Sequence, residues 1–213
     1  MGNRKECNAL KPIEDFAVLD FSGFSITDHA DAKWQAWSRV YEYEWVLKIL
    51  NQLEDKLPNK KFPTSIHNTS WGFEGCHVDF KEELDSRGGT ILHSDIRESV
   101  LDHTTVWDLL TDPPSDWWEG FDFVINVSTM EEVNGSHVEI LRRLFSMVKP
   151  GGFLLCTFDL PGLQLPAIES EVETIYKTVK NPVKGSNSIC PQPRFDYLTF
   201  GRLVLQKVEE SAA

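Results

Sequence analysis

The residues that first suggest chemistry are two glycines and an aspartate around an expected strand–turn–helix unit. Gly72 and Gly75 fall in the turn after an expected strand at 64–68, where glycine lets the backbone approach a ligand closely. Asp95 ends the next expected strand, Thr90–Asp95, and a carboxylate there can accept hydrogen bonds from both hydroxyls of a ribose. The pattern indicates a site for a nucleotide-like ligand. Since many α/β proteins contain a strand, a glycine turn and a helix in succession, a purely structural role is the alternative.

The elements that must position these residues alternate between strands and helices. We expect strands at 64–68, Thr90–Asp95, 104–109, Phe121–Val127, 153–158 and 197–208. We expect helices at 31–57, 76–87, 136–148 and 168–179. This alternation predicts an α/β fold with a mostly parallel sheet and helices on both faces. In such sheets ligands bind at the carboxyl ends of the strands.

Two of the expected helices carry clear local signals. In the first, Asp31 is the expected N-cap, and an aromatic stripe at steps of three and four residues predicts a face packed into the core. The stripe consists of Trp34, Trp37, Tyr41, Trp45 and Ile49. In the third, Ser136 and Glu139 form a capping box, and the tetrapeptide at 149–152 (KPGG) predicts an abrupt end.

Composition and charge limit the classes of function. The chain has 213 residues and a formal net charge of −12, which fits a single domain over 1–213 with a full core. The acidic balance argues against a nucleic-acid partner and is compatible with a small molecule or a cationic ligand. No long apolar run or apolar leader is present, and four scattered cysteines favour free thiols, so we expect a cytoplasmic protein away from membranes. The histidines lack metal-site spacing, so no metal is expected.

The order of motifs from 61 to 159 resembles the class I S-adenosylmethionine-dependent methyltransferase family. An acidic residue, Asp108, follows the third expected strand, and Phe121–Val127 (FDFVINV) runs into a loop with Glu131 and Glu132. The next helix is followed by KPGG and then by another strand. The resemblance implies a Rossmann-like, doubly wound sheet whose last strand is antiparallel, with an N-terminal helical extension. It divides the chain into an N-terminal helical cap at 1–60 and a core at 61–213.

The resemblance also implies a role for each matching position. The loop under the amino-acid end of S-adenosylmethionine would contain Asn68, Ser70, Trp71, Gly72 and Gly75. The rest of the cofactor would be lined by Asp95 and Ile96 at the ribose, Asp108 and Leu109 at the adenine, and Asn126, Val127 and Ser128 at the end of the fourth strand. On the substrate side it would place Glu131 and Glu132, and the alternative for these two residues is a solvated charge pair. His137 follows this loop and is a candidate base at neutral pH, and the alternative is a structural residue in the first turn of the helix.

The first loop departs from the family pattern. Asn68 replaces the usual acidic residue, and of the glycine series only the central Gly72 is clearly kept. Polar residues in the N-terminal stripe, among them Glu42, are expected either to form a lid or to be parts of a packed helix. The leading interpretation is a methyltransferase that transfers a methyl group to a small-molecule acceptor by in-line displacement. The alternatives are a non-catalytic partner subunit with this fold and a nicotinamide-dependent enzyme.

Overall fold

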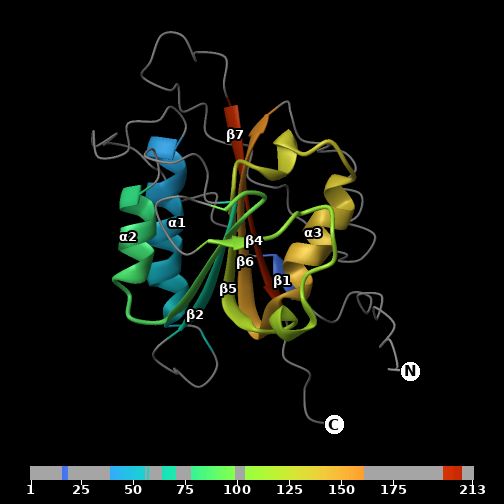
Figure 1. Ribbon diagram of the computed structural model, residues 1–213. Coiled ribbons are helices and arrows are strands. Elements are labelled where there is room, and N and C mark those ends of the chain that lie inside the picture. Colours follow the sequence, from blue (N-terminus) through green and yellow to red (C-terminus); the bar gives the residue numbers. More distant parts are fainter. Residues whose placement is uncertain are drawn as a thin grey trace.

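The computed structural model describes residues 16–18, 39–55, 57, 64–70, 78–98, 104–160 and 199–207 (Figure 1). Three predicted features lie outside these residues: the Asp31 cap, the glycine turn with Trp71, Gly72 and Gly75, and the helix at 168–179. Within the described part of the chain, no helix is both long enough and apolar enough to cross a membrane.

A seven-stranded sheet forms the middle layer. Its strands are β1 (Phe16–Val18), β2 (Ser65–Thr69), β3 (Thr90–Asp95), β4 (Thr105–Val106), β5 (Phe121–Val127), β6 (Val148–Leu160) and β7 (Thr199–Lys207). Their order across the sheet is β1-β7-β6-β5-β2-β3-β4. Strands β2 to β6 are mutually parallel, and β7 runs antiparallel between β6 and β1. The predicted fold, a Rossmann-like mostly parallel sheet with an antiparallel last strand, is confirmed.

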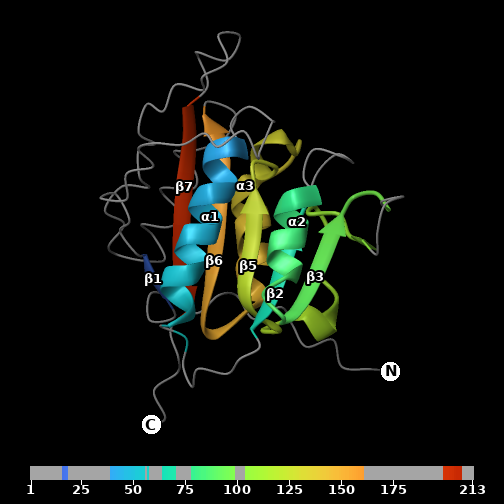
Figure 2. The ribbon, with the colours of Figure 1, turned by 90° about the vertical axis from the view of Figure 1, so that its left-hand side faces the viewer.

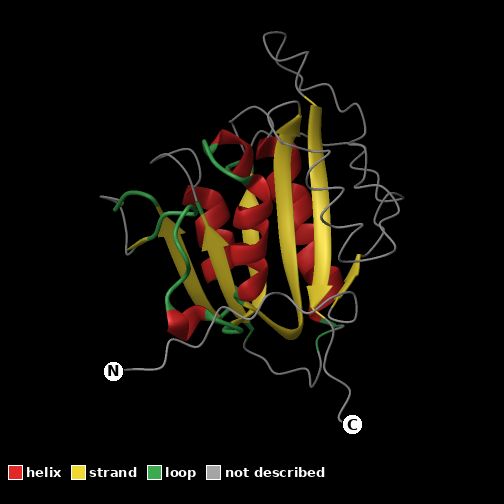
Figure 3. Ribbon diagram, turned by 90° about the vertical axis from the view of Figure 1, so that its right-hand side faces the viewer, coloured by secondary structure: helices red, strands yellow, loops and turns green. Residues whose placement is uncertain are grey.

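Helices cover both faces of the sheet, as predicted. Helices α1 (Arg39–Glu54) and α2 (Val78–Asp85) lie side by side on one face (Figure 2). Helix α3 (His137–Ser146) covers the other face (Figure 3), together with the 3-10 turns η2 (Ser115–Trp117) and η3 (Met130–Glu132). The expected N-terminal helical extension is therefore present as α1, which packs on the sheet. The division into a cap at 1–60 and a core at 61–213 stays a prediction.

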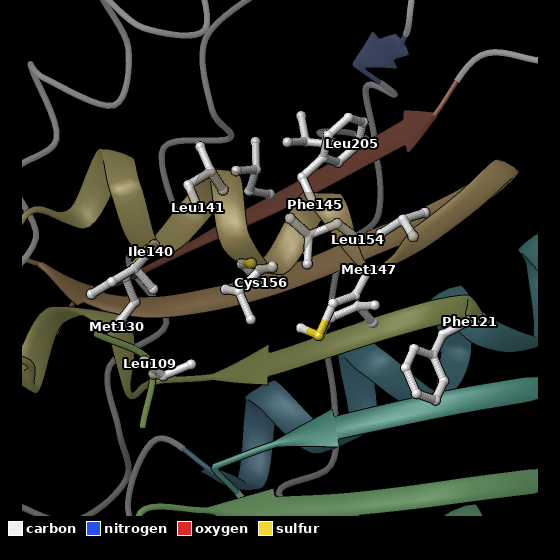
Figure 4. Close-up of a cluster of buried hydrophobic side chains, with 14 of the residues drawn as sticks. Leu109, Phe121, Met130, Ile140, Leu141, Phe145, Met147, Leu154, Cys156 and Leu205 are labelled. Carbon is white, nitrogen blue, oxygen red and sulfur yellow. The ribbon is translucent and has the colours of Figure 1, made fainter. Parts of the chain in front are cut away.

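The core has one apolar layer on each face of the sheet. On the α3 face, helix residues such as Leu141 and Phe145 pack against Leu154 of β6 and Leu205 of β7 (Figure 4). On the opposite face, alternate strand residues such as Phe123 and Leu155 pack against α1 and α2. Because successive strand residues point to opposite faces, β5 and β6 contribute to both layers, which explains the apolar runs at 123–125 and 153–156.

The aromatic stripe of α1 is buried where the structure describes it. Trp45 and Ile49 are 1% and 0% exposed, and Tyr43 stacks on Phe80 of α2 with ring centroids 4.1 Å apart. Trp34, Trp37 and the side chain of Tyr41 lie outside the described residues. Core packing, rather than an exposed binding face, is therefore the role of the described part of the stripe.

The start of α3 was predicted correctly, but its end was not. Ser136 is the N-cap, and its side chain accepts a hydrogen bond from the Glu139 backbone N–H. The helix ends at Ser146, and the KPGG tetrapeptide belongs to β6, which begins at Val148. In the β5–β6 pairing, Phe121 faces Val148 and Phe123 faces Phe153, so the tetrapeptide forms an irregular stretch within the strand. Gly151 permits this because its φ of 82° is strained for other residues.

Two strands differ from expectation at the edges of the sheet. Strand β4 is limited to Thr105–Val106 instead of 104–109, because the chain turns away where Thr111 N–H donates to the Asp108 carbonyl at 2.9 Å. Strand β1 was not among the expected strands, and it pairs with β7, near the other end of the chain. Three residues are too few to show a strand period, so only the long-range pairing defines β1.

At the amino ends of the strands, Asp122, Ser65 and Lys149 join β2, β5 and β6. Asp122 Oδ2 accepts hydrogen bonds from Ser65 N and Oγ, both at 2.7 Å, and from Lys149 Nζ at 3.1 Å. Partial burial alone would raise the pKa of Asp122, but these hydrogen bonds and the lysine charge outweigh burial and hold the pKa below its ordinary value. The ionised carboxylate is therefore stabilised in the folded state.

We expect Asp122→Asn to lower the free energy of unfolding at neutral pH, with a loss that shrinks in acid. Because the folded-state pKa is depressed, the contribution of Asp122 is complete above the unfolded-state pKa of about 4 and disappears as the pH falls through the lower folded value. Urea unfolding of both proteins between neutral pH and pH of about 2.5 measures the difference. Asp116→Asn, at an exposed position of η2, is the control. A loss that is constant across this range would show that the charge of Asp122 does not matter.

Candidate functional site

The carboxyl ends of β2, β3, β4 and β5 meet along one edge of the sheet, and Figure 2 shows those of β3 and β5. Thr69 at the end of β2 is paired with Ser94 of β3 on one side and with Asn126 of β5 on the other. Asp95 is paired with Val106 of β4. Predicted site residues from four separate strand ends are therefore brought to the same edge, which is where α/β sheets bind ligands.

Two partly buried carboxylates lie at the carboxyl ends of β3 and β4: Asp95 is the last residue of β3, and Asp108 lies just after β4. Asp95 Oδ1 accepts a hydrogen bond from Arg97 N at 3.4 Å, and Asp108 Oδ1 accepts one from Leu110 N at 2.9 Å. The two turns are tied together because Trp107 N–H donates to the Asp95 carbonyl at 2.8 Å. Each carboxylate is thus held by its own turn, beside the neighbouring strand end.

Exposed apolar residues lie close in the sequence to these carboxylates. Ile96 is 62% exposed, Val106 58% and Leu110 42%, and these are the exposed large hydrophobic residues of the described part of the chain. All three lie within the turns and the edge strand that carry Asp95 and Asp108. Apolar groups gathered beside carboxylates at a strand edge suit a ligand that has both an apolar ring and hydroxyl or amino groups.

Leu109, which was predicted beside the adenine, has a core position. It is 5% exposed and packs in the α3-face layer near Met130 and Ile140 (Figure 4). The residue exposed next to Asp108 is instead Leu110, which the sequence reasoning missed. The sequence did contain a signal for Leu110: the polar Thr111-Asp112 indicates a turn, and Leu110 is the leucine next to it. A direct contact of Leu109 with a ligand stays a prediction.

The turn after β4 is supported by an aromatic cluster around His67. The imidazole lies 4.8 Å from the rings of Trp117 and Phe121 and 6.0 Å from Trp107, the residue before Asp108. Burial, with a smaller effect of His93, lowers the pKa of His67 to about 3, so the ring is neutral at physiological pH. His67 Nε2 is bonded to Ser94 Oγ at 2.8 Å. The cluster thus fixes the position of the Asp108 turn relative to β2 and β3.

The end of β5 presents an amide in a fully buried position. Asn126 is 0% exposed, and its Nδ2 donates to Thr69 Oγ1 at 2.9 Å. The Thr69 hydroxyl in turn donates to the carbonyl of Ile125 at 2.9 Å. Among the described residues, Asn126 Oδ1 has no hydrogen-bond partner. A buried acceptor in this state indicates a donor from water or from a ligand at this strand end.

The next two residues of this strand end point elsewhere. Val127 packs in the apolar layer beneath α1. Ser128 is 4% exposed, has a φ of 39°, and donates its hydroxyl hydrogen bond to Glu42 Oε1 of α1. Only their backbones and the Asn126 amide are therefore suited to line the strand edge.

The end of β2 is held from the side by β3 and α2. Asn68 Nδ2 lies 3.2 Å from His93 Nδ1, and His93 Nε2 lies 3.0 Å from Asp85 Oδ1. Asp85 also accepts a 2.6 Å bond from Lys81. Ser70 follows with a φ of 57°, and its N–H donates to the Ser94 carbonyl at 2.6 Å. Asn68 is therefore part of a hydrogen-bonded series of side chains within the fold. The loop that continues with Trp71 lies outside the described residues.

The three predicted substrate-side residues have different environments. Glu131, in η3, is buried, and its charge adds to burial in raising the pKa of Cys156, so that thiol stays protonated. Glu132 is exposed. His137 is 2% exposed, and its Nε2 donates to the Val133 carbonyl at 3.3 Å. His137 therefore has a structural bond at the start of α3, while its role as a base stays a prediction.

Comparisons with solved structures define what the arrangement resembles. The chain superposes on the CMeT domain of the citrinin polyketide synthase with a TM-score of 0.53 and 14% identity, over 81% of this chain and 53% of that one. The carbon methyltransferase of CurJ gives 0.56 and 13%, over 81% and 55%. An S-adenosylmethionine-dependent methyltransferase from Mesorhizobium loti gives 0.50 and 12%, over 77% and 97%. No protein-family model matches the chain, and no curated protein matches it by sequence.

The chain has the class I S-adenosylmethionine-dependent methyltransferase fold. It spans a little over half the length of the first two of these structures, and nearly the full length of the Mesorhizobium methyltransferase. The resemblance noticed in the motifs from 61 to 159 is therefore confirmed at the level of the fold. Asp95, Asp108 and Asn126 all lie at the carboxyl edge of the parallel strands of this fold.

Proposed function

We propose that the protein is an S-adenosylmethionine-dependent methyltransferase with a small-molecule acceptor. The observation that carries the proposal is the pairing of two carboxylates, Asp95 and Asp108, with the exposed apolar residues Ile96 and Leu110 at the carboxyl edge of a methyltransferase fold. An adenosine needs hydrogen-bond acceptors for its ribose hydroxyls and amino group and apolar surface for its ring. The residues present therefore fit this cofactor.

Each of these residues has a separate part in holding the cofactor. Asp95 accepts hydrogen bonds from the ribose hydroxyls, and Asp108 accepts one from the adenine amino group. Ile96 and Leu110 cover the ring and exclude water from it. The unpartnered Asn126 Oδ1 accepts a hydrogen bond from a polar group of the cofactor or from a water beside it. The loop with Ser70, Trp71, Gly72 and Gly75 is proposed to lie under the amino-acid end.

The chemistry requires alignment more than an elaborate set of catalytic groups. When bound, S-adenosylmethionine supplies a methyl group already activated by its sulfonium centre. The protein then has to orient the acceptor in line and keep water away. We place Glu131 on the acceptor side because it is buried in η3, the element that follows β5.

The net charge of −12 favours a small-molecule acceptor over a nucleic acid, and the scattered cysteines favour a cytoplasmic location.

Calorimetric titration tests the proposal directly. The full chain is titrated with S-adenosylhomocysteine, S-adenosylmethionine and NADH, and we expect binding of the first two with a Kd below about 1 mM and no binding of NADH. Binding of NADH alone would instead indicate a nicotinamide-dependent enzyme. If neither adenosyl ligand gives a binding heat at millimolar concentration, the methyltransferase proposal is contradicted. The alternative is then a non-catalytic partner subunit, which is favoured by the hydrogen bond between Asn68 and His93.

A further inference from the structure

The carboxylate of Glu42 connects α1 to the ends of β5 and β6. Glu42 lies in the first turn of α1 and is 0% exposed. Its Oε1 accepts hydrogen bonds from the hydroxyls of Ser128, just after β5, and of Thr157 in β6, the latter at 2.6 Å. These partners are 86 and 115 residues away in the sequence. A buried carboxylate with two hydroxyl donors is a specific connection, because an unsatisfied carboxylate there would be costly.

A buried positive charge belongs to the same layer. Arg202 of β7 is paired with Thr157 in the strand ladder and is 3% exposed. Its Cζ lies 5.7 Å from the ring centroid of Trp45, which is one helical turn from Glu42. Glu42, Thr157, Trp45 and Arg202 are therefore all buried on the face of the sheet that α1 covers.

Ser128 has a backbone conformation that its residue type disfavours. Its φ of 39° lies in the left-handed region, where a residue with a Cβ is strained and glycine is not. Two bonds hold it there: its N–H donates to the Thr157 carbonyl at 2.9 Å, and its hydroxyl donates to Glu42. The left-handed residue turns the chain from β5 over the sheet edge toward η3. Its conformation therefore determines where Asn126 and Glu131, on either side of it, are presented.

We propose that Glu42 is a positioning residue that holds Ser128 in the left-handed conformation and thereby keeps the β5 strand end in the form that binds the cofactor. The proposal rests on the proposed function, since the binding it affects is that of S-adenosylmethionine. When only a fraction of molecules has the competent turn, the apparent Kd increases by the inverse of that fraction. Loss of the Glu42 bond releases the strained turn and lowers that fraction.

The test compares two replacements at Ser128 and repeats Glu42→Leu, which removes the acceptor oxygens, in one of them. Ser128→Ala removes the hydroxyl and keeps the strain, so the Kd for S-adenosylhomocysteine should increase about 5- to 30-fold. Ser128→Gly removes both the hydroxyl and the strain, so its Kd should stay within about 3-fold of the wild type. Glu42→Leu should raise the Kd about 5-fold alone and less than 2-fold in the Ser128→Gly background. Equal losses for Ser128→Ala and Ser128→Gly would overturn the proposal.

Thr157→Val is the matched control, since it removes the other hydroxyl bonded to Glu42 from a residue in ordinary strand conformation. It should alter the Kd by less than about 3-fold, and an effect as large as that of Ser128→Ala would indicate packing only. Hydrogen exchange of residues 126–132 without ligand gives a second measurement, with faster exchange expected in Glu42→Leu. If the wild type binds neither adenosyl ligand, the proposed function fails, and the exchange result alone decides the role of Glu42.

Discussion

Asp95→Ala is expected to weaken S-adenosylhomocysteine binding by about 1–3 kcal/mol, which is about 5- to 150-fold in Kd. The reason is the loss of charge-assisted hydrogen bonds to the two ribose hydroxyls. Asp95 is held at the end of β3, with its carbonyl bonded to Trp107 N and its Oδ1 to Arg97 N. Because the side chain is only partly buried and its turn has other bonds, the fold should tolerate the change. Calorimetric titration of both proteins measures the effect.

Two further variants make this result specific. Asp108→Ala should weaken binding less than Asp95→Ala, because the adenine also contacts apolar surface. Asp116→Ala, at an exposed position of η2, should leave the Kd unchanged. If Asp95→Ala binds as tightly as the wild type, Asp95 only terminates β3, and the adenosine would have to lie elsewhere. A Kd unchanged in both Asp95→Ala and Asp108→Ala would remove the main support for the proposed function.

Gly89→Ala is expected to destabilise the protein by about 3 kcal/mol, which lowers Tm by about 6–12 °C for a chain of this size. A Cβ on Gly89 would lie 1.9 Å from the backbone oxygen of Thr64. That oxygen accepts the hydrogen bond of Thr90 N at 3.1 Å, at the point where β2 and β3 begin to pair. Backbone atoms cannot move aside as a flexible side chain can, so the first part of this pairing has to shift. Urea unfolding measures the loss.

The neighbouring glycine is the control. Gly88 has a φ of 72°, and a Cβ built there meets nothing within 4 Å. Gly88→Ala should therefore cost only the backbone strain, about 1 kcal/mol. Both glycines lie at the opposite end of β3 from Asp95, so adenosyl ligands should bind either folded variant as they bind the wild type. Equal destabilisation by the two variants would show that the contact with Thr64 is relieved at little cost.

Local patterns in the sequence were sufficient for most of the elements. Strand β5 was predicted with its observed bounds, because a mostly apolar segment directly follows the turn at Gly120. The start of α3 was predicted because Ser136 has the side chain that an N-cap needs. The alternation of strands and helices then determined the parallel sheet, since a helix between two strands brings the second parallel to the first. The placement of Asp95 and Asn126 at one edge follows from that order.

The tertiary structure decided which way individual side chains point and which distant segments meet. It turned Leu109 into the core and left Leu110 exposed, committed Asn68 to His93, and joined Glu42 to Ser128. It also made KPGG part of β6 and added β1 beside β7. Periodicity and capping depend on residues within a few positions of one another, so they can be read along the chain. These contacts join residues up to 191 positions apart, as Phe16 and Lys207 are, or depend on one turn, so only the folded chain determines them.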